Sequence, residues 1–217
     1  MEHGNSLILN IDTKRINKEL KENKIVVITG FQGIDKNNDI ETLGRGGSDT
    51  SAVAIASALH AKECYIYSDV EGVYTADPNK ISSAKKLKQI SYDEMIELSS
   101  NGAKVLHTKC VELAKEKNIA IHAKSTFNDN EGTIINSEIR KTNVKSLVKN
   151  DTKISLIGEG IADTDEILQK ALKIIRQMNY SNYKLDISKN RISILFEESI
   201  SDDILKKMHY EIIEQES

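Results

Sequence analysis

The pattern of apolar and polar side chains predicts an α/β arrangement for the first two thirds of the chain. Residues 24–29 and 64–67 are short apolar runs rich in β-branched or aromatic side chains, typical of buried strands. Residues 52–59 between them form an alanine-rich run typical of a helix, and residues 12–23 show the spacing of a solvated surface helix. This order favours a layered domain with a mostly parallel sheet, in which ligands bind beyond the carboxyl ends of the strands.

Further local signals follow along the chain. Ser91 and Glu94 have the spacing of a capping box and predict a helix over residues 91–99. Residues 119–124 alternate as a strand does, and the charged run of residues 80–88 is interpreted as a solvated face.

The last third of the chain has the pattern of a separate small α+β unit. Its order of strand, helix, hairpin and helix is typical of a ferredoxin-like split βαβ unit. We expect a fourth strand from residues 144–148 or from a partner chain, because none is apparent after residue 213. The polar connection that precedes the unit places a domain boundary between residues 1–141 and 142–217. The expected elements are a strand at 152–157, a helix at 163–178, a hairpin of 183–187 with 191–196, and a helix at 201–213 that Ser201 caps.

Residues 42–50 form a glycine-rich stretch with three glycines around Arg45. Ser48 and Asp49 are residues preferred at helix N-caps, and a helix N-terminus after such a loop favours an anion. Arg45 is suited to reading a carboxylate or phosphate in a bidentate way. The P-loop and dinucleotide patterns are absent, and a tight turn with a helix cap is the alternative interpretation. In a parallel sheet, residues 30–33, 44–49 and 68–74 converge on one edge.

Composition and cysteine content indicate which partners and which cellular location to expect. The 217 residues carry 30 basic and 33 acidic side chains, a net charge of -3, which predicts neither a nucleic acid nor a membrane as partner. Cys64 and Cys110 lie in separate apolar stretches, so we expect no disulfide and no metal site, and a reducing cytoplasmic location. We also expect no signal peptide and no membrane span.

Three motifs in order carry a family resemblance: TLGRGGSDT at residues 42–50, YSDVEGVYTADP at 67–78 and GAKVLH at 102–107. Together they resemble the C-terminal, nucleotide-binding part of the catalytic domain of aspartate kinases (aspartokinases), over roughly residues 10–135. The resemblance implies part of an amino-acid-kinase (carbamate-kinase-like) domain. The C-terminal unit resembles the ACT regulatory domain of the same enzymes.

The resemblance implies transfer of the γ-phosphate of ATP, with Mg²⁺, to the side chain of L-aspartate. The product, 4-phospho-L-aspartate, begins lysine (diaminopimelate), threonine and methionine biosynthesis. In this picture Arg45 and Ser48 bind aspartate, and Asp49 is the catalytic carboxylate that orients a cationic partner. His107 is interpreted as a structural residue at a helix start. The resemblance assigns nucleotide binding to Ser68, Asp69, Tyr74, Lys104 and Val105.

Two departures from the family pattern bear on whether the chain is a complete kinase. Asn79 stands where the family has an arginine, and the Lys-Phe-Gly-Gly motif of the family's N-terminal half is absent. The sequence therefore predicts a shortened kinase or one completed by a partner. A non-catalytic regulatory or amino-acid- and nucleotide-binding chain is the alternative. The ACT-like unit is expected to form a homo-oligomer and to bind an effector such as lysine or threonine, or else to act as a dimerisation module alone.

Overall fold

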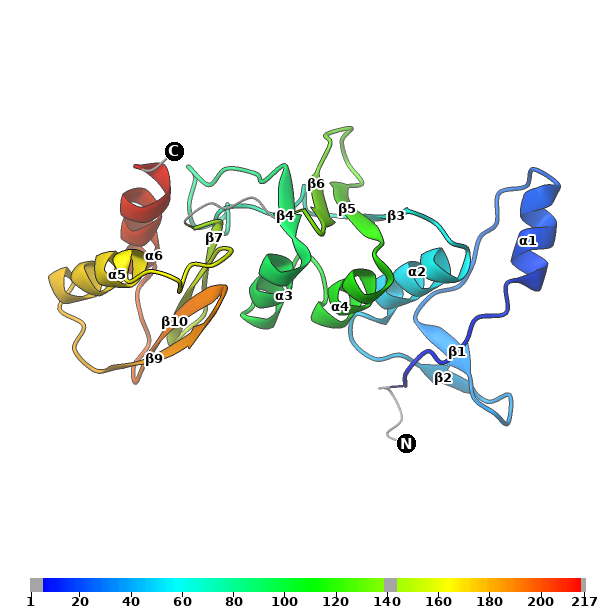
Figure 1. Cartoon of the computed structure of the whole chain (residues 1–217), viewed down its shortest axis with the longest axis horizontal. Helices are drawn as coiled ribbons and strands as arrows, with labels where there is room; N and C mark the ends of the chain where they lie inside the picture. Colours follow the sequence, from blue (N-terminus) through cyan, green and yellow to red (C-terminus); the bar gives the residue numbers. More distant parts are fainter. Residues whose placement is uncertain (1–5, 139–143, 216–217) are drawn as a thin grey trace.

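The computed structural model describes residues 6–138 and 144–215. Figure 1 shows three parts in a row: an N-terminal arm with α1, β1 and β2, a central unit with α2 to α4 and β3 to β6, and a C-terminal unit with the remaining elements. The predicted boundary at residue 141 falls outside the described residues, so the division into residues 1–141 and 142–217 stays a prediction.

The N-terminal arm holds a short helix and a hairpin. Helix α1 (Lys14–Lys21) confirms the predicted surface helix, because none of its residues is buried. Strands β1 (Gln32–Ile34) and β2 (Ile40–Thr42) pair antiparallel around a polar turn, in which Asp35 accepts the backbone N–H groups of Asn37 and Asp39.

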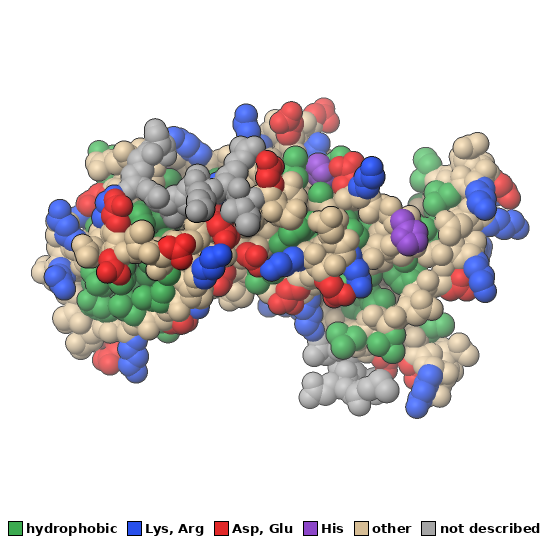
Figure 2. All heavy atoms as spheres, in the orientation of Figure 1, with side chains coloured by type: hydrophobic (Ala, Val, Ile, Leu, Met, Phe, Trp, Pro, Cys, Tyr) green, Lys and Arg blue, Asp and Glu red, His purple; other side chains and the backbone are tan. Residues whose placement is uncertain are grey.

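The predicted strand at residues 24–29 is wrong, since this stretch pairs with no strand among the described residues. Ile25 and Val27 are 95% and 92% exposed. A β-branched run becomes a strand only where another strand supplies hydrogen-bond partners, which a sequence pattern does not reveal. Figure 2 shows hydrophobic side chains at the surface near α1 and near β1 and β2.

The central unit contains a mixed four-stranded sheet in the order β3-β5-β6-β4. The pairs β3–β5 and β4–β6 are parallel and β5–β6 is antiparallel, so the expected α/β layering with a mostly parallel sheet is confirmed. The strands are β3 (Glu63–Ser68), β4 (Gln89–Ser91), β5 (Ala120–Ser125) and β6 (Thr133–Asn136).

Three helices lie against this sheet (Figure 1): α2 (Gly47–Ala58), α3 (Tyr92–Ser100) and α4 (Thr108–Lys117). The capping box at Ser91 and Glu94 is confirmed by both of its hydrogen bonds. Edge strand β3 is buried on the helix side only. Tyr65 and Tyr67 are 45% and 59% exposed on the other face, where Tyr65 stacks on His122, so the prediction of a fully buried strand is wrong there.

The C-terminal unit is an antiparallel sheet in the order β7-β8-β10-β9 with two helical segments. Strand β7 is the edge strand next to β8. The fourth strand therefore comes from this chain, near the expected residues 144–148, and not from a partner chain. The elements are β7 (Ser146–Lys149), β8 (Lys153–Ile157), α5 (Glu166–Gln177), β9 (Tyr183–Ser188), β10 (Arg191–Phe196), α6 (Asp202–Met208) and the π-helical turn η1 (His209–Glu214).

The last predicted helix differs from the observed one in its second half. Ser201 caps α6 by accepting the N–H of Asp203 at 3.1 Å, as predicted. The continuation is the π-helical turn η1, a wider helix that no sequence signal announced.

The connection between β3 and β4 links the two units. Ala76 and Ile81 belong to the hydrophobic core of the C-terminal unit, and Lys80 forms an ion pair with Asp202 at 3.1 Å. The interpretation of residues 80–88 as a solvated face is therefore wrong at Ile81, which is 4% exposed. Because its neighbours in the sequence are charged, the pattern gave no sign that Ile81 packs against the C-terminal unit.

The exposure of residues 24–29 gives a stability prediction. We expect Ile25→Ala to change the free energy of unfolding by less than about 0.5 kcal/mol, because the side chain is already in water. The control Ile121→Ala, in the core of the central unit, is expected to cost about 2–5 kcal/mol. Urea titration of both variants measures the difference, and a loss of over about 2 kcal/mol at Ile25 would show that this run is buried.

Candidate functional site

The N-termini of α2 and α4 meet at one point. Gly46 is the N-cap of α2 with φ of 75°, and His107 is the N-cap of α4. The two caps are in contact, since a Cβ on Gly46 would lie 2.3 Å from the Cβ of His107. The positive ends of two helix dipoles therefore point toward the same place, an arrangement that favours an anion.

Asp49, in the first turn of α2, lies between the two helices. Its carboxylate lies near His107 at the start of α4 and accepts a weak hydrogen bond, 3.5 Å long, from the hydroxyl of Ser48. Burial raises the pKa of Asp49 above its usual value, while Ser48 and His107 act in the opposite direction. The carboxylate is thus held in place and partly desolvated.

The expected capping of α2 by Ser48 or Asp49 is wrong. The helix begins two or three residues earlier than such a cap would give, at Gly47, and Gly46, which has no side chain, takes the N-cap position. No side chain caps the helix, so the first-turn N–H groups of Ser48 and Asp49 are not satisfied by a cap. Such groups are suited to hydrogen bonding with a ligand anion.

Two predicted loop segments do come together here. The backbone N–H of Phe31 donates to the hydroxyl of Ser51 at 2.9 Å, and the N–H of Leu43 donates to the carbonyl of Phe31 at 3.0 Å. Residues 30–33 and 44–49 are therefore neighbours, as the sequence predicted. Phe31 and Ser51 were not among the predicted site residues, and a lone aromatic and a helical serine gave no signal.

Two groups at this point have unused bonding capacity. Arg45 is exposed and forms no ion pair with any residue that the structure describes. The Nδ1 atom of His107 is buried without a hydrogen-bond partner within the described ranges. His107 lies at the helix start, as interpreted, with its ring packed against Gly46.

The third segment, residues 68–74, packs against the turn between β5 and β6. The N–H of Thr126 donates to the carbonyl of Ser68 at 2.8 Å, and Asp69 is exposed. These contacts support Ser68 and Asp69 from the β5 side. Across the described residues, no hydrogen bond or ion pair joins this segment to the Arg45 loop, so the predicted meeting of all three segments is not observed as direct contact.

Tyr74 is half-buried and has a carboxylate neighbour. Its hydroxyl donates to Glu71 at 3.3 Å, and Glu71 also accepts from Asn128 at 2.9 Å and lies 3.8 Å from the ammonium of Lys86. Burial, followed by the charge of Glu71, raises the pKa of Tyr74. The sequence analysis missed Glu71 and Asn128, although the i, i+3 spacing of Glu71 and Tyr74 was visible.

Lys104 and Val105 lie in the connection between α3 and α4. Lys104 is exposed, and Val105 packs against the core of the central unit. The connection ends at His107, so Lys104 is carried on the same short loop that reaches the meeting point of the helices.

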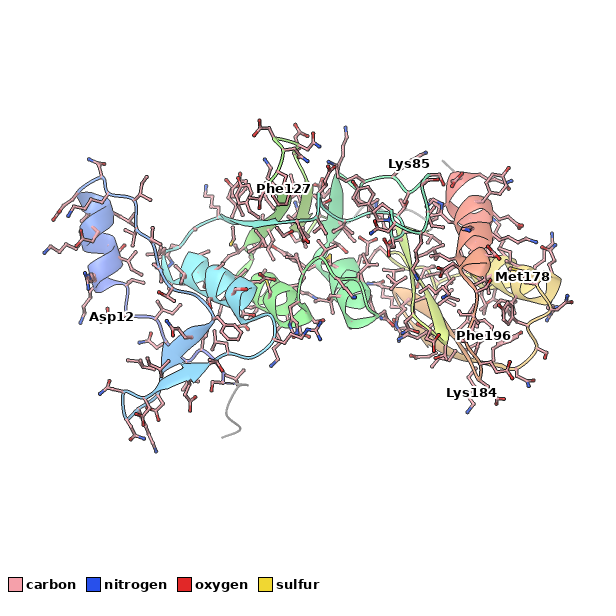
Figure 3. The ribbon with its side chains drawn as sticks, turned by 180° about the vertical axis from the view of Figure 1, so that it is seen from behind. Asp12, Lys85, Phe127, Met178, Lys184 and Phe196 are labelled. Carbon is pink, nitrogen blue, oxygen red and sulfur yellow. The ribbon has the colours of Figure 1, made fainter. Side chains whose placement is uncertain are left out.

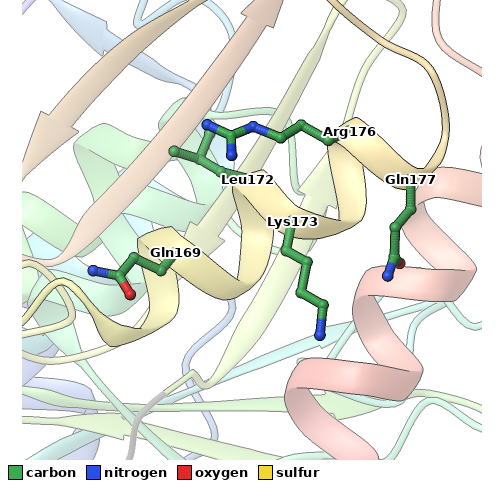
Figure 4. A pocket seen from close by; sticks show the side chains of 5 residues that line it. All are labelled: Gln169, Leu172, Lys173, Arg176 and Gln177. Carbon is green, nitrogen blue, oxygen red and sulfur yellow. The ribbon is translucent and has the colours of Figure 1, made fainter.

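Two surface hollows lie away from the predicted site residues. A hollow of about 420 Å³ lies along the outer face of α5 and includes Lys173 and Arg176 (Figure 4), and another of about 550 Å³ lies between α1 and residues 24–29. Neither includes Arg45 or Tyr74. Within residues 6–138 and 144–215, no three His, Cys, Asp or Glu side chains are grouped to hold a metal ion.

The sequence pattern of the amino acid kinase family matches residues 3–125. The chain belongs to this family. This amino acid kinase family member is 51% identical over 164 residues to an aspartokinase of Bacillus sp. (strain MGA3). The aligned residues make up 76% of this chain and 37% of the Bacillus protein. It is 41% identical over 190 residues to the aspartokinase of Geobacillus stearothermophilus, covering 85% and 46% respectively.

Solved structures give the same relationship. E. coli aspartokinase III in complex with aspartate and ADP (R-state) matches with a TM-score of 0.59 and 27% identity, over 90% of this family member and 46% of that chain. Clostridium acetobutylicum aspartate kinase matches with a TM-score of 0.58 and 29% identity, over 93% and 48%. The chain thus spans less than half the length of these relatives. None of the helices in the described part of the chain has the length and apolarity that a membrane span needs.

Gly46 gives a test of how tightly the two helix ends are packed. We expect Gly46→Ala to cost about 2 kcal/mol or more, because the new Cβ meets His107 and the backbone is at positive φ. Gly33→Ala is the matched control, since its Cβ would meet nothing within 4 Å. Urea unfolding compares the two, and equal stabilities would contradict the close contact.

Proposed function

We propose that the chain provides the substrate-binding part of an aspartate kinase, which transfers the γ-phosphate of ATP to the side-chain carboxylate of L-aspartate. The observation that carries this proposal is the meeting of the α2 and α4 N-termini beside the exposed Arg45. Both reactants are anions, and phosphoryl transfer depends mainly on positioning and charge neutralisation. The aspartokinase relatives support this assignment.

On the acceptor side, Arg45 holds a carboxylate of aspartate through its guanidinium, and Ser48 adds its hydroxyl or its first-turn N–H. Asp49 is the proposed catalytic carboxylate. Because its carboxylate lies between the N-termini of α2 and α4, near His107, it is placed to orient a cation near the phosphates. Aspartate offers a carboxylate that is already ionised at neutral pH, so no general base is required.

On the nucleotide side we assign Ser68, Asp69 and Tyr74, together with Lys104 and Val105. The half-buried Tyr74 offers a ring face to the base or ribose, and the exposed Lys104 offers its ammonium to a phosphate. The complex of the E. coli relative with aspartate and ADP supports a site for both ligands. Mg²⁺ bound to the ATP phosphates supplies charge neutralisation at the transferring group.

The C-terminal unit is proposed to be an ACT-like, ferredoxin-like regulatory domain. Its sheet order and its two helices support this proposal, as does the structure of the E. coli relative in complex with lysine and aspartate (T-state). We extend the proposal to an amino-acid effector such as lysine or threonine. A place in lysine, threonine and methionine biosynthesis follows from the proposed product, and a cytoplasmic location from the metabolites it uses.

A non-catalytic chain that binds nucleotide or amino acid and regulates a partner is the second candidate. The specific observation that favours it is Asn79, which stands where the family has an arginine. Binding of ATP without turnover distinguishes this candidate from a kinase.

The first experiment measures phosphate transfer from Mg-ATP in the presence of L-aspartate, with hydroxylamine to trap the acyl phosphate. We expect trapped product from the wild-type chain and at least a hundredfold loss in Arg45→Ala, about the loss of two charge-assisted hydrogen bonds. Arg176→Ala on α5 is the charge-matched control and should keep the wild-type rate.

The outcomes separate the two candidates. Product that depends on aspartate and on Arg45 establishes the kinase. Absence of product from the wild type, with ATP bound in calorimetry, favours the regulatory chain. Equal product from Arg45→Ala and wild type would contradict the assignment of Arg45.

A homo-oligomer through the C-terminal unit is also proposed. Strand β9 is an edge strand whose Leu185 and Ile187 are 40% and 45% exposed. If two copies pair antiparallel with Leu185 opposite Leu185, then Lys184 faces Asp186 of the second copy, and Tyr183 faces Ile187. The edge is thus self-complementary in both charge and apolar surface. Figure 3 shows Lys184 on the outer border of this unit, where a second copy has access.

The proposed pairing predicts that the wild-type chain is a dimer and that Leu185→Glu raises the dissociation constant at least about tenfold by placing two like charges opposite each other. Lys173→Glu, a charge change on the outer face of α5, is the control and should leave the dimer intact. Sedimentation velocity over a concentration series measures both. A dimer that survives Leu185→Glu would show that β9 is not the interface.

A further inference from the structure

A buried histidine connects the end of the chain to the proposed nucleotide site. His209, the first residue of η1, is 1% exposed. Its Nε2 atom lies 2.8 Å from the hydroxyl of Thr75, 134 positions earlier in the chain, and its Nδ1 atom lies 2.8 Å from the carboxylate of Glu214. Glu214 also accepts the hydroxyl of Ser83 at 2.5 Å. Both ring nitrogens are therefore satisfied by partners on different segments.

The N–H, the hydroxyl and the carbonyl of Thr75 all form hydrogen bonds. Its N–H donates to the carbonyl of Lys85 at 3.0 Å, its hydroxyl oxygen accepts the N–H of Lys85 at 3.0 Å, and its carbonyl accepts the N–H of Leu147 on β7 at 2.8 Å. Because the hydroxyl oxygen already accepts from Lys85, its proton is available to donate to Nε2 of His209. This assigns the Nδ1–H tautomer, which donates to Glu214.

The residue before Thr75 is Tyr74, which we propose as a nucleotide-binding residue. Its carbonyl accepts the hydroxyl of Ser146, next to Leu147 on β7, at 2.8 Å. Two elements of the C-terminal unit thus hold this segment: β7 bonds the main chain of Tyr74 and Thr75, and η1 bonds the hydroxyl of Thr75. Figure 3 shows Lys85 beside the C-terminal helix, in agreement with this contact.

We propose that His209 is a positioning residue for the nucleotide site: through the hydroxyl of Thr75 it fixes the main chain that carries Tyr74. The proposal rests on the proposed nucleotide site. Its physical basis is that Tyr74 and Thr75 share a peptide unit, so freeing the Thr75 side chain loosens the support of the Tyr74 ring. The position of η1 on the C-terminal unit is thereby transmitted to the nucleotide.

Two substitutions at His209 separate this role from general packing. The amide of Asn reaches the position of Nδ1 and keeps the bond to Glu214 but loses Thr75, whereas the amide of Gln reaches the position of Nε2 and keeps Thr75 but loses Glu214. Calorimetric titration with MgADP measures nucleotide affinity, and urea unfolding measures the stability of the same variants.

We expect His209→Asn to weaken MgADP binding about three- to tenfold, the effect of one lost hydrogen bond, and His209→Gln to stay within about twofold of wild type. Thr75→Val and Thr75→Ser form a second pair, in which only Val removes the hydroxyl, and this pair decides the question if His209→Asn does not fold. Equal MgADP affinity in all variants, or equal weakening within each pair, would overturn the positioning role. Absence of MgADP binding by the wild-type chain would instead overturn the proposed nucleotide site, and this inference with it.

Discussion

The contact between the N-termini of α2 and α4 is the constraint on which the candidate site depends. Two positive helix ends repel each other unless a negative group lies between them. Asp49 meets this need, since it lies in the first turn of α2 and its carboxylate lies near His107 at the start of α4. Only a glycine at position 46 allows the two caps to approach so closely. One acidic side chain and one missing side chain therefore determine where the loop with Arg45 lies.

Sequence reasoning found the elements whose signals are local. The capping box at Ser91, the two-residue turn between β9 and β10, and the Ser201 cap each depend on residues within a few positions. It failed where an element needs a distant partner. Residues 24–29 have the composition of a strand and pair with none in the described chain, and Ile81 is buried against a unit that begins more than sixty residues later.

The same distinction applies to the candidate site. Arg45, Ser48 and Asp49 were identified because glycines and a helix start occur together within one motif. Glu71, which accepts the hydroxyl of Tyr74, lies in the motif of residues 67–78, but its partner Asn128 lies far outside that motif. The bond from His209 to Thr75 spans 134 positions, and a histidine in a helix pattern gives no sign of its partner. Motifs therefore predicted the candidate ligand contacts, whereas the residues that support them are found only from the structure.

The connection between β3 and β4 contributes residues to both hydrophobic cores and also carries Tyr74 of the proposed nucleotide site. This single segment carries Tyr74, gives Ala76 and Ile81 to the core of the C-terminal unit, and gives Val73 to the core of the central unit. Because closely packed cores resist small displacements, a shift of either core must change the main chain between Val73 and Ala76. The hydroxyl of Thr75 lies within that short span, so its bond to His209 connects the C-terminal unit directly to the residue next to Tyr74, in the proposed nucleotide site.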